Sequence, residues 1–577
     1  MAPRLSPAIW KALLARGTGG DGSLQGRIRE MLVSAILDGT LPPGTPVPSS
    51  REMAEHLGVA RNTVVLAYQQ LRDEGYLEAR QRSGYFVNGD MLAGRLLPLP
   101  PSPAGKPMDW ERRLWLRPTA QRSITKPADW QKHPYPFLYG QFDPTLFPTA
   151  DWRECCIKTL SVMGIREWAP DQIARDDESL VQQIRTRVLP RRGVWAGADE
   201  LIVTVGAQHA LYMVADLLVR QSTRVAIEEP GYPDARNIFL CRTPNVLSLP
   251  VDPWGLPVDG RLSGVDYVYV TPSHQCPTGV TMPIERRRAL LAKADAEDFI
   301  IVEDDFESEN RFDGEPIPAL KSLDRSERVI YIGSLSKSLA PGLRIGYIVA
   351  APPLIAELRA LRRLMLRHPS TFVQRAFSLF LSLGHHDAQM RRLAVAQRER
   401  FAMLIDVMRR HLPDCEVVPV SGGGSCWVRL PDGVSAVALA ACAAEEGVLI
   451  EPGDVFFRQS PPPASYVRLG YQSITAAAIG PGIEVLAKVV GRLRPVSQRT
   501  AAGDPFGSGS WPRCGRRGTL KSPPCWLRYA CRRAGRRETC SRKSRGRRRR
   551  RARRRPRPRR DRSARRAGSP RAPRRGR

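Results

Sequence analysis

The chain has 577 residues, of which 42% are hydrophobic, and this is enough apolar material for several domains with large cores. The formal net charge of +32 is concentrated at one end, because residues 501–577 hold 30 Lys and Arg against 3 acidic residues. No apolar leader and no run of about 18 uncharged apolar residues occurs. The cysteines show neither a C-x-x-C metal pattern nor a disulfide framework. These features argue against a secreted, membrane or zinc-binding protein, and we expect a cytoplasmic one.

The first ninety residues show three helical patterns followed by two short strands. Apolar residues recur at helical spacing over 24–38, a second helix follows a cap at Ser49 or Ser50, and a third helix runs over 61–74. A Gly-Val turn joins the second helix to the third, which is a helix-turn-helix pattern. The strands expected over 77–87 surround an Arg-Ser-Gly turn and are predicted to form a wing.

Candidate DNA contacts lie at the start of the third helix and on the wing. Arg and Asn side chains can make bidentate contacts with base edges, Thr can bond a base or a phosphate, and further Arg side chains suit phosphates. For any one of these residues, a solvated helix face is a fair alternative. The candidates are Arg61, Asn62 and Thr63 for bases, and Arg51, Arg80 and Arg82 for phosphates.

The order of these features resembles the winged helix-turn-helix domain of the GntR superfamily. The motifs that carry the resemblance are S-R-E-M-A-E-x-L-G-V, R-N-T-V, Y-x-x-L and E-G-Y, followed by the wing. The resemblance implies that residues 20–88 form a domain that binds double-stranded DNA. Residues 89–132 are rich in Pro and Leu, and we expect them to be a semi-extended tether without a specific function.

From about 133 to 495, short apolar runs alternate with helical patterns, which predicts an α/β fold with a mostly parallel sheet. The expected strands are 203–205, 225–227, 267–270, 300–302, 329–332 and 345–349, with helices that include 207–220 and 284–296. Residues 385–495 are predicted to form most of a small α+β subdomain, in which 421–424 is a strand-linking turn. Ligands of such sheets bind at the carboxyl ends of the strands, where the polar clusters of this sequence fall.

The most informative cluster follows the strand expected at 329–332. Ser334, Ser336 and Lys337 lie on a Gly/Ser-rich loop, and Arg344 follows seven residues after the lysine. A lysine amine can condense with an aldehyde, while hydroxyls and a guanidinium can hold a phosphate. The loop therefore suits a phosphorylated carbonyl cofactor. Taken alone, the S-x-S-K motif would fit an ordinary surface lysine better.

Other strand ends carry residues that suit the same kind of ligand. Residues 204–209 open a helix whose backbone N–H groups can hold a phosphate. Tyr232 presents a ring that can stack on a flat cofactor, and the loop 271–279 contains Cys276. Asp304 can pair with a protonated pyridine nitrogen, although a helix cap is an equally good interpretation of that residue alone.

Together, these clusters resemble fold-type I pyridoxal phosphate enzymes of the aminotransferase class. The resemblance implies pyridoxal 5'-phosphate as the cofactor, an internal aldimine at Lys337 and a pyridinium partner in Asp304. It implies that Arg468 takes a substrate carboxylate through a bidentate pair, and that a segment from Asp143 to Trp152 lines the site. The residues implied to lie against the ring and phosphate are Ala207, Gln208, Tyr232, Cys276, Phe306, Ser334, Ser336 and Arg344.

Two positions depart from that family's pattern. Phe306 stands where a tyrosine usually bonds the phenolic oxygen of the cofactor, and Cys276 stands at or near an asparagine position. Each change removes or weakens a hydrogen bond worth roughly 1 kcal/mol, which favours sensing over turnover. The segment around Trp168 and Asp176-Asp177 departs as well, so it supplies no phosphate ligand.

A winged helix fused to such a domain resembles the MocR group of GntR regulators. The resemblance implies a head-to-tail homodimer that regulates transcription and senses pyridoxal phosphate, an amino acid or an amine through aldimine chemistry at Lys337. The alternatives are a working aminotransferase with a DNA-binding appendage, and a DNA-binding protein with a dead cofactor site. Residues 501–577 are predicted to be disordered, as a DNA-binding arm or as a frameshifted terminus with no selected role.

Overall fold

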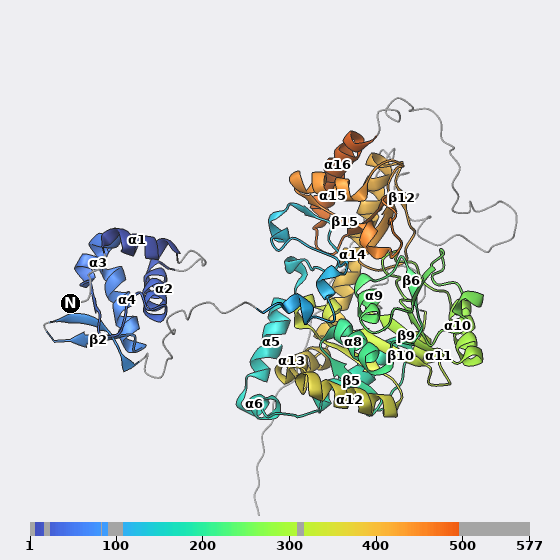
Figure 1. Ribbon diagram of the computed structural model, residues 1–577, viewed down its shortest axis with the longest axis horizontal. Helices are drawn as coiled ribbons and strands as arrows, with labels where there is room; N and C mark the ends of the chain where they lie inside the picture. The colour runs from blue at the N-terminus through green and yellow to red at the C-terminus, as the bar shows by residue number, and fades with distance from the viewer. Residues whose placement is uncertain (1–5, 17–22, 82, 91–107, 308–316, 495–577) are drawn as a thin grey trace, which may run out of the picture. The chain divides into compact units, whose positions relative to one another are not determined.

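The computed structural model describes residues 6–16, 23–81, 83–90, 108–307 and 317–494. The chain divides into two compact units, Met1–Leu114 and Trp115–Arg577 (Figure 1). The predicted phosphate contact Arg82 and the predicted tail 501–577 lie outside the described residues. Among the helices within the described ranges, none is long and apolar enough to cross a membrane. The described side chains also include no group of three His, Cys, Asp or Glu placed to hold a metal ion.

The first unit is a small helical bundle closed by a three-stranded antiparallel sheet of order β1-β3-β2. Its elements are α1 (Pro7–Arg16), α2 (Leu24–Leu37), β1 (Pro46–Val47), α3 (Ser50–Leu57), α4 (Arg61–Asp73), β2 (Leu77–Arg80) and β3 (Gly84–Val87). The three expected helices and the two wing strands are therefore confirmed. Helix α1 was not expected from the sequence.

Local sequence explains how the helices of the first unit begin and turn. The Ser49 hydroxyl accepts the N–H of Glu52 at 3.2 Å, so Ser49 caps α3 and Ser50 is its first residue. Gly58 ends α3 with a φ of 70°, a left-handed conformation that glycine adopts without strain. Trp10 of α1 is only 1% exposed and packs into the core of this unit, so the core includes residues ahead of position 20.

The second unit is built on a seven-stranded sheet of order β5-β11-β10-β9-β8-β6-β7. The strands are β5 (Leu201–Thr204), β6 (Val225–Glu229), β7 (Val246–Pro250), β8 (Tyr267–Val270), β9 (Ile300–Asp305), β10 (Val329–Ser334) and β11 (Gly346–Val349). Only β11 runs antiparallel to its neighbours, β10 and β5. This confirms the expected α/β fold with a mostly parallel sheet. Apart from the edge strand β7, the strands are almost wholly buried, as expected for a sheet covered on both faces.

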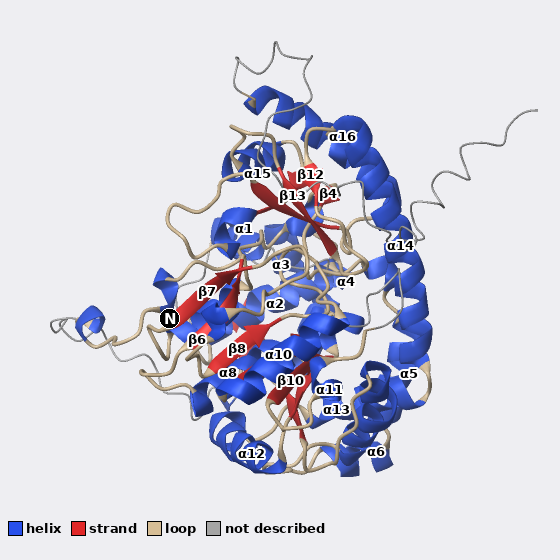
Figure 2. Ribbon diagram, turned by 90° about the vertical axis from the view of Figure 1, so that its right-hand side faces the viewer, coloured by secondary structure: helices blue, strands red, loops and turns tan. Residues whose placement is uncertain are grey.

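Helices cover this sheet, as Figure 2 shows for α8, α10 and α12. The helices of this region are α5 (Thr149–Thr159), α6 (Val162–Trp168), α7 (Glu178–Gln183), α8 (Gly206–Leu218), α9 (Pro233–Leu240), α10 (Ile284–Glu297), α11 (Leu320–Leu323), α12 (Pro352–Leu366) and α13 (Thr371–Ser382). Asp176, which precedes α7, forms buried ion pairs with Arg359 and Arg362 of α12 at 2.9 and 2.5 Å. Asp176 therefore fixes α12 to the chain ahead of α7.

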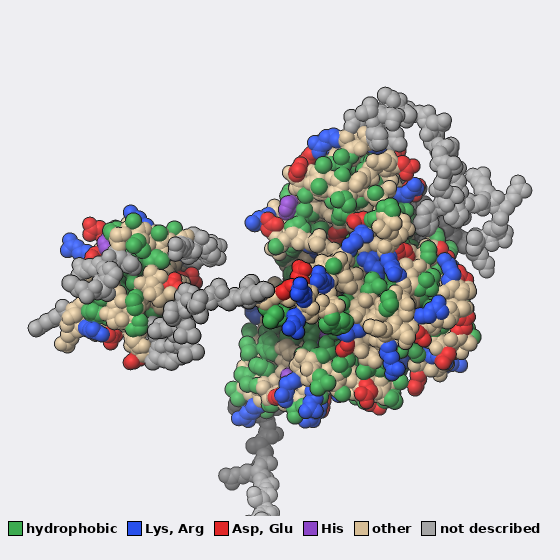
Figure 3. All heavy atoms as spheres, in the orientation of Figure 1, with side chains coloured by type: hydrophobic (Ala, Val, Ile, Leu, Met, Phe, Trp, Pro, Cys, Tyr) green, Lys and Arg blue, Asp and Glu red, His purple; other side chains and the backbone are tan. Residues whose placement is uncertain are grey.

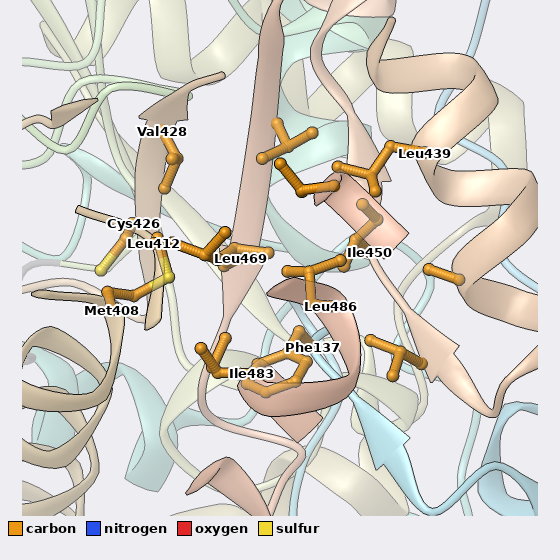
Figure 4. Packing of buried hydrophobic residues seen from close by; sticks show 14 of the residues in the cluster. Phe137, Met408, Leu412, Cys426, Val428, Leu439, Ile450, Leu469, Ile483 and Leu486 are labelled. Carbon is orange, nitrogen blue, oxygen red and sulfur yellow. The ribbon is translucent and has the colours of Figure 1, made fainter. Parts of the chain in front are cut away.

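The smaller part of the second unit follows the long helix α14 (His385–His411), which runs along one side of this unit in Figure 2. It contains the antiparallel sheet β12-β13-β16-β15. Its elements are β12 (Glu416–Val417), β13 (Ser425–Arg429), α15 (Ala436–Glu445), β14 (Val448–Leu449), β15 (Glu451–Pro452), β16 (Tyr466–Gly470) and α16 (Ala476–Leu493). Strand β4 (Tyr135–Pro136) pairs with β14, and Phe137 packs beside Ile483 and Leu486 (Figure 4). The start of the large unit is thus part of this smaller core.

Residues 115–132, which we expected to belong to the tether, are bound to the large unit. The Asn237 side chain donates to the carbonyl oxygen of Arg122 at 2.9 Å, and the Arg122 guanidinium pairs with Asp454 at 2.9 Å. Ile124 packs against a buried apolar cluster formed by Cys276, Trp427, Phe456 and Phe457. Composition alone could not show these specific contacts, and they make this stretch part of the large unit rather than a free linker.

Candidate functional site

Lys337 and Asp304 meet at the carboxyl ends of two neighbouring parallel strands. Asp304 lies near the end of β9, opposite Ile332 of β10, and Lys337 lies on the short 3-10 turn η9 (Ser336–Ser338) that follows β10. Burial lowers the pKa of Lys337 below its usual 10.5, although the nearby carboxylate of Glu307 opposes this shift. The unprotonated amine, which is the nucleophilic form, is therefore more accessible here than on a solvated lysine.

The amine of Lys337 lies between two aromatic rings. Its Nζ donates to the hydroxyl of Tyr139 at 2.7 Å, and it is 4.2 Å from the centroid of that ring and 5.0 Å from the centroid of Phe306. The Tyr139 hydroxyl in turn donates to Oε2 of Glu307 at 3.2 Å. The lysine is therefore held in a defined position by aromatic and hydrogen-bonding contacts.

Asp304 presents one carboxylate oxygen that accepts no hydrogen bond from any described residue. Oδ2 accepts the hydroxyl of Tyr269 at 2.8 Å, whereas Oδ1 is buried and has no partner. Burial raises the pKa of Asp304 to about 6. A buried acceptor without a donor is costly, so this oxygen fits the N–H of a protonated pyridine ring.

An anion cradle lies at the start of α8. Gly206 has a φ of 77°, and a Cβ built on it would lie 3.0 Å from Nη2 of Arg344. The same guanidinium donates to the carbonyl oxygen of Val205 at 3.3 Å. The backbone N–H groups of Ala207 and Gln208 open the same helix, so a cation and a helix N-terminus converge on one place.

The two hydroxyls predicted to hold the phosphate, those of Ser334 and Ser336, differ in burial and in hydrogen bonding. Ser336 is buried, accepts the N–H of Ile345 at 2.6 Å and donates to the carbonyl oxygen of Ile345 at 3.0 Å. This hydroxyl braces the loop, which leaves it little capacity for a ligand. Ser334 ends β10 and is partly exposed. The side chain of Gln208 is directed to Asp234, at 3.2 Å, so only its backbone belongs to the cradle.

The remaining predicted ring contacts, Tyr232, Cys276 and Phe306, belong to one apolar cluster. Tyr232 precedes α9, and its hydroxyl donates to Oδ2 of Asp234 at 3.3 Å. Cys276 and Phe306 share an apolar cluster with Trp427 and Phe456. Burial raises the pKa of the Cys276 thiol to about 12, so this thiol stays neutral near pH 7.

A cavity of about 40 Å³ opens beside Lys337 and is lined by Asp143, Phe147 and Arg400, among others. The Arg400 guanidinium forms a buried ion pair with Asp143 at 2.5 Å. Asp143 and Phe147 therefore line the approach to the lysine, as the resemblance implied. Trp152 instead packs against Phe377 and Phe380 with ring centroids 6.3 and 5.9 Å apart.

Arg468, expected to take a substrate carboxylate, already has a carboxylate partner within the chain. Its Nε lies 2.6 Å from Oε2 of Glu451, and both side chains are 3% exposed. Burial alone would lower the pKa of Arg468, but Glu451 raises it and the net shift is upward. Lys126 approaches the other oxygen of Glu451 at 3.4 Å.

Sequence reasoning missed four residues of this site: Tyr139, Glu307, Glu451 and Lys126. Glu307 lies three residues after Asp304, and alternation along β9 gives no reason to single it out. Glu451 could have been found by pairing the strand near 451 with the strand near 468, because the two residues are direct neighbours across β15 and β16. Tyr139 and Lys126 come from segments far away in the sequence, and no local pattern marks them.

Most of the predicted DNA contacts in the first unit are exposed to solvent. Arg61 and Asn62 are exposed in the first turn of α4, Thr63 is half-buried behind them, and Arg51 is exposed on α3. Arg80 on the wing is 2.5 Å from a carboxylate oxygen of Glu78 and lies 4.3 Å over the ring of Phe86. The first turn of α4 therefore offers an exposed Asn and Arg of the kind that contacts base edges, and Nε of Arg61 also donates to the hydroxyl of Ser50 at 3.5 Å.

Comparison with known proteins covers both units. Residues 24–87 match the family of bacterial regulatory proteins called the gntR family, and residues 180–485 match aminotransferase class I and II. The solved archaeal alanine:glyoxylate aminotransferase superposes with a TM-score of 0.61 at 25% identity, covering 67% of this chain and 100% of that one. The alpha-aminoadipate aminotransferase LysN of Thermus thermophilus gives a TM-score of 0.61 at 26% identity, covering 67% of this chain and 99% of that one. This aminotransferase fold is in general dependent on pyridoxal phosphate.

Two curated relatives share the whole two-part arrangement. The HTH-type transcriptional regulator TauR of Rhodobacter capsulatus is 43% identical over 473 residues, covering 82% of this chain and 97% of that protein. The probable rhizopine catabolism regulatory protein MocR of Rhizobium meliloti is 33% identical over 501 residues, covering 84% of this chain and 98% of that protein. The chain therefore belongs to the MocR and TauR type of transcriptional regulator, in which a GntR helix-turn-helix domain that binds DNA is joined to a class I/II aminotransferase domain.

Proposed function

We propose that this regulator binds pyridoxal 5'-phosphate at Lys337 and senses the cofactor together with an amine effector that reaches the same site. The observation that carries the proposal is that Lys337 and Asp304 lie at the ends of two adjacent strands. One group is an amine with a lowered pKa, and the other is a buried carboxylate with one oxygen unpartnered. Ordinary core packing gives no reason to keep both groups.

The residues around this pair would hold each part of the cofactor. Arg344 and the N-terminus of α8 suit the phosphate, Tyr232 suits the face of the ring, and Oδ1 of Asp304 suits the N–H of the ring. Bound pyridoxal phosphate supplies a carbonyl carbon that reacts with primary amines. Lys337 would provide the first such amine, positioned by Tyr139.

The immediate surroundings favour sensing over turnover. Phe306 carries no hydrogen-bonding group, and the neutral thiol of Cys276 is a weak donor, so neither strongly bonds the phenolic oxygen of the ring. Glu451 engages Nε of Arg468, so part of the guanidinium is already paired with a carboxylate of the chain. Steady release of a keto acid from an added amino acid would support an aminotransferase instead.

Residues 121–126 connect the proposed ligand site to the DNA-binding unit along the chain. Ile124 packs in the cluster that contains Phe306, and Lys126 contacts Glu451. A ligand changes DNA affinity only if it binds two states of the protein with different affinity. We propose that the docked and released forms of residues 121–126 are two such states.

A homodimer is part of the proposal, and an apolar surface supports it. Figure 3 shows hydrophobic side chains gathered over α5 and α6, where Ile157, Val162 and Met163 are 63, 70 and 65% exposed. Contiguous exposed apolar surface of this kind is typical of protein interfaces. Sedimentation of the wild-type protein beside Met163→Glu measures this directly, and the variant is expected to sediment as the smaller species.

The test of cofactor binding is the visible absorbance spectrum of the purified full-length protein after addition of pyridoxal phosphate. We expect a protein-bound cofactor band in the wild type that is absent in Lys337→Ala. Lys488→Ala is the matched control, because that lysine is exposed on α16, outside the proposed dimer surface. The control is expected to keep the band.

The same samples are then titrated with DNA duplexes selected by the wild-type protein from a random pool. We expect the cofactor to change the affinity of the wild type and of Lys488→Ala, but not that of Lys337→Ala. A spectrum with no bound band in the wild type would contradict the proposal. It would leave a DNA-binding protein whose aminotransferase-like unit has another role.

A further inference from the structure

The side of α4 that faces away from the core of the first unit carries an apolar side chain. Leu66 lies in the second turn of α4 and is 49% exposed. Val64, Tyr68 and Leu71 of the same helix are buried in that core, and helical spacing places Leu66 on the opposite side. A single exposed leucine is common on protein surfaces, so its meaning depends on the side chains beside it.

Two amide side chains share this face with Leu66. Asn62 precedes Leu66 by four residues and Gln69 follows it by three, and residues with these spacings lie on one side of a helix. Both amide side chains are exposed, and the helix rises by about 10 Å from Asn62 to Gln69. The three residues therefore form one continuous surface, the α4 stripe, with the apolar side chain between the two amides.

Charge distinguishes the two ends of α4. Arg51 and Arg61 are exposed at the starts of α3 and α4, where the helix N-termini add partial positive charge. The other end of α4 carries Asp73 and Glu74, and each is paired with an arginine of the first unit, so the charges there cancel. Because DNA phosphates are attracted to positive charge, the first two turns of α4 are the part that suits a DNA groove.

The chemistry of the α4 stripe fits the edges of A·T base pairs. In the major groove, an Asn or Gln side chain makes a bidentate contact with adenine, and an apolar side chain contacts the 5-methyl group of thymine. A cytosine in place of the thymine would lack the methyl group and would present an amine donor, for which leucine has no acceptor. Leucine at this position therefore favours thymine over cytosine.

We infer that Leu66 is a specificity-determining residue of the DNA-binding unit, which packs against the 5-methyl group of a thymine in the major groove. The α4 stripe then reads A·T base pairs, with Asn62 at an adenine and Leu66 at a thymine. The inference goes beyond the proposed function and does not depend on it, because it concerns only the first unit and its DNA.

The experiment uses the full-length protein and the duplex that the wild type selects from a random pool. Each thymine of the duplex is replaced in turn by deoxyuridine, which removes the 5-methyl group and leaves the hydrogen-bonding edge unchanged. We expect deoxyuridine at one thymine, or at its symmetry mate, to weaken binding by the wild type about fourfold, as for one buried methyl group. Equilibrium titrations at one fixed salt concentration measure the affinities.

Leu66→Ala removes the apolar contact. We expect this variant to bind the thymine and deoxyuridine duplexes equally at that position, whereas Leu66→Met, which keeps an apolar side chain, retains the preference for thymine. Leu24→Ala is the control, because Leu24 is 40% exposed at the start of α2. That end of α2 lies beside the C-terminal end of α4, where the Gln25 side chain donates to that of Gln70 at 3.4 Å. The control is expected to keep the wild-type preference.

Two results would overturn the inference. A wild type that binds every deoxyuridine duplex as tightly as the parent duplex would show that no thymine methyl group is read. A Leu66→Ala variant that keeps the full preference for thymine would assign the methyl contact to another residue. Neither result bears on cofactor binding, which the absorbance spectrum tests separately.

Discussion

Burial of Asp304 destabilises the folded protein when its carboxyl group is ionised. Its pKa is raised to about 6 by burial, so the ionised form is less stable in the folded state than in the unfolded chain. The unfolded state then binds fewer protons than the folded state between about pH 4 and pH 6. Stability is therefore lost as the pH rises through this window, and the full cost is present above it.

The first prediction follows from this cost. Asp304→Asn is expected to raise the unfolding free energy of the cofactor-free large unit near pH 7.5 by on the order of 2 kcal/mol, and to leave it nearly unchanged at pH 4. The same substitution should weaken binding of pyridoxal phosphate, because the ring N–H loses a charged acceptor. Melting curves and cofactor titrations at both pH values measure these effects. A variant that is destabilised at pH 7.5 would show that Oδ1 already has a favourable role without the cofactor.

Single residues show clearly what local sequence can and cannot predict. Lys337, Arg344 and Asp304 stand in short motifs whose residue types suggest chemistry by themselves, and the structure brings them to neighbouring strand ends and the adjacent helix start. Glu451 and Lys126 take their role from partners 17 and 325 residues away in the sequence. No motif could reveal that Arg468 has a partner of its own, because that depends on the register of two strands.

At the scale of elements, α4 presents the candidate base contacts of the first unit. Asn62→Ala is expected to cost about 1–3 kcal/mol of affinity for a selected duplex and to leave affinity for random DNA nearly unchanged, because Asn contacts base edges. Arg51→Ala should weaken both to a similar degree and should reduce the salt slope by about one, as for a phosphate contact. Equilibrium titrations at several salt concentrations test both. Equal losses on both duplexes for Asn62→Ala would place that residue on the phosphate backbone.

The start of α8 is the second element with a specific expectation. Gly206→Ala places a Cβ 3.0 Å from the Arg344 guanidinium and forces alanine to a φ of 77°, which costs about 1–2 kcal/mol in backbone strain. We expect at least tenfold weaker binding of pyridoxal phosphate, measured by absorbance titration. Gly491→Ala in α16 is the matched control, since a Cβ there meets no atom within 4 Å. Unchanged cofactor affinity in Gly206→Ala would argue against a phosphate at this place.

The hydrophobic pattern predicted most strands of the large sheet, but it did not predict where several of them end. Strand β8 has the predicted bounds, whereas β9 and β10 continue beyond the apolar runs into Asp305 and Ser334. Those extensions carry polar residues, which a pattern of apolar runs does not include, although backbone pairing continues through them. Strand β7 was missed because only two of its five residues are buried and no continuous apolar run marks it, and α1 was missed because its ten residues form only a short amphipathic stretch.

At the scale of the whole molecule, the charge of the chain belongs mainly to its last 77 residues, which lie outside the described structure. A protein that ends at Arg494 is expected to keep the bound-cofactor band, because the last described helix ends at Leu493. It should also keep its preference for the selected duplex while losing affinity for random DNA, with a smaller salt slope. Titrations of the two proteins against both duplexes measure this. Loss of the cofactor band on truncation would instead show that the basic segment supports the large unit.

The contacts of residues 121–126 have a consequence for how such a protein can evolve. The aminotransferases it resembles in structure are matched over nearly their full lengths, so the enzyme-like fold can exist without a DNA-binding unit. Here residues 121–126, which precede the first strand of the large unit, contact Glu451 and the apolar cluster that contains Cys276. Under the proposed function, this segment is therefore part of the sensor. Substitutions in these six residues would then change signal transmission without changing the fold of the aminotransferase-like unit or of the DNA-binding unit.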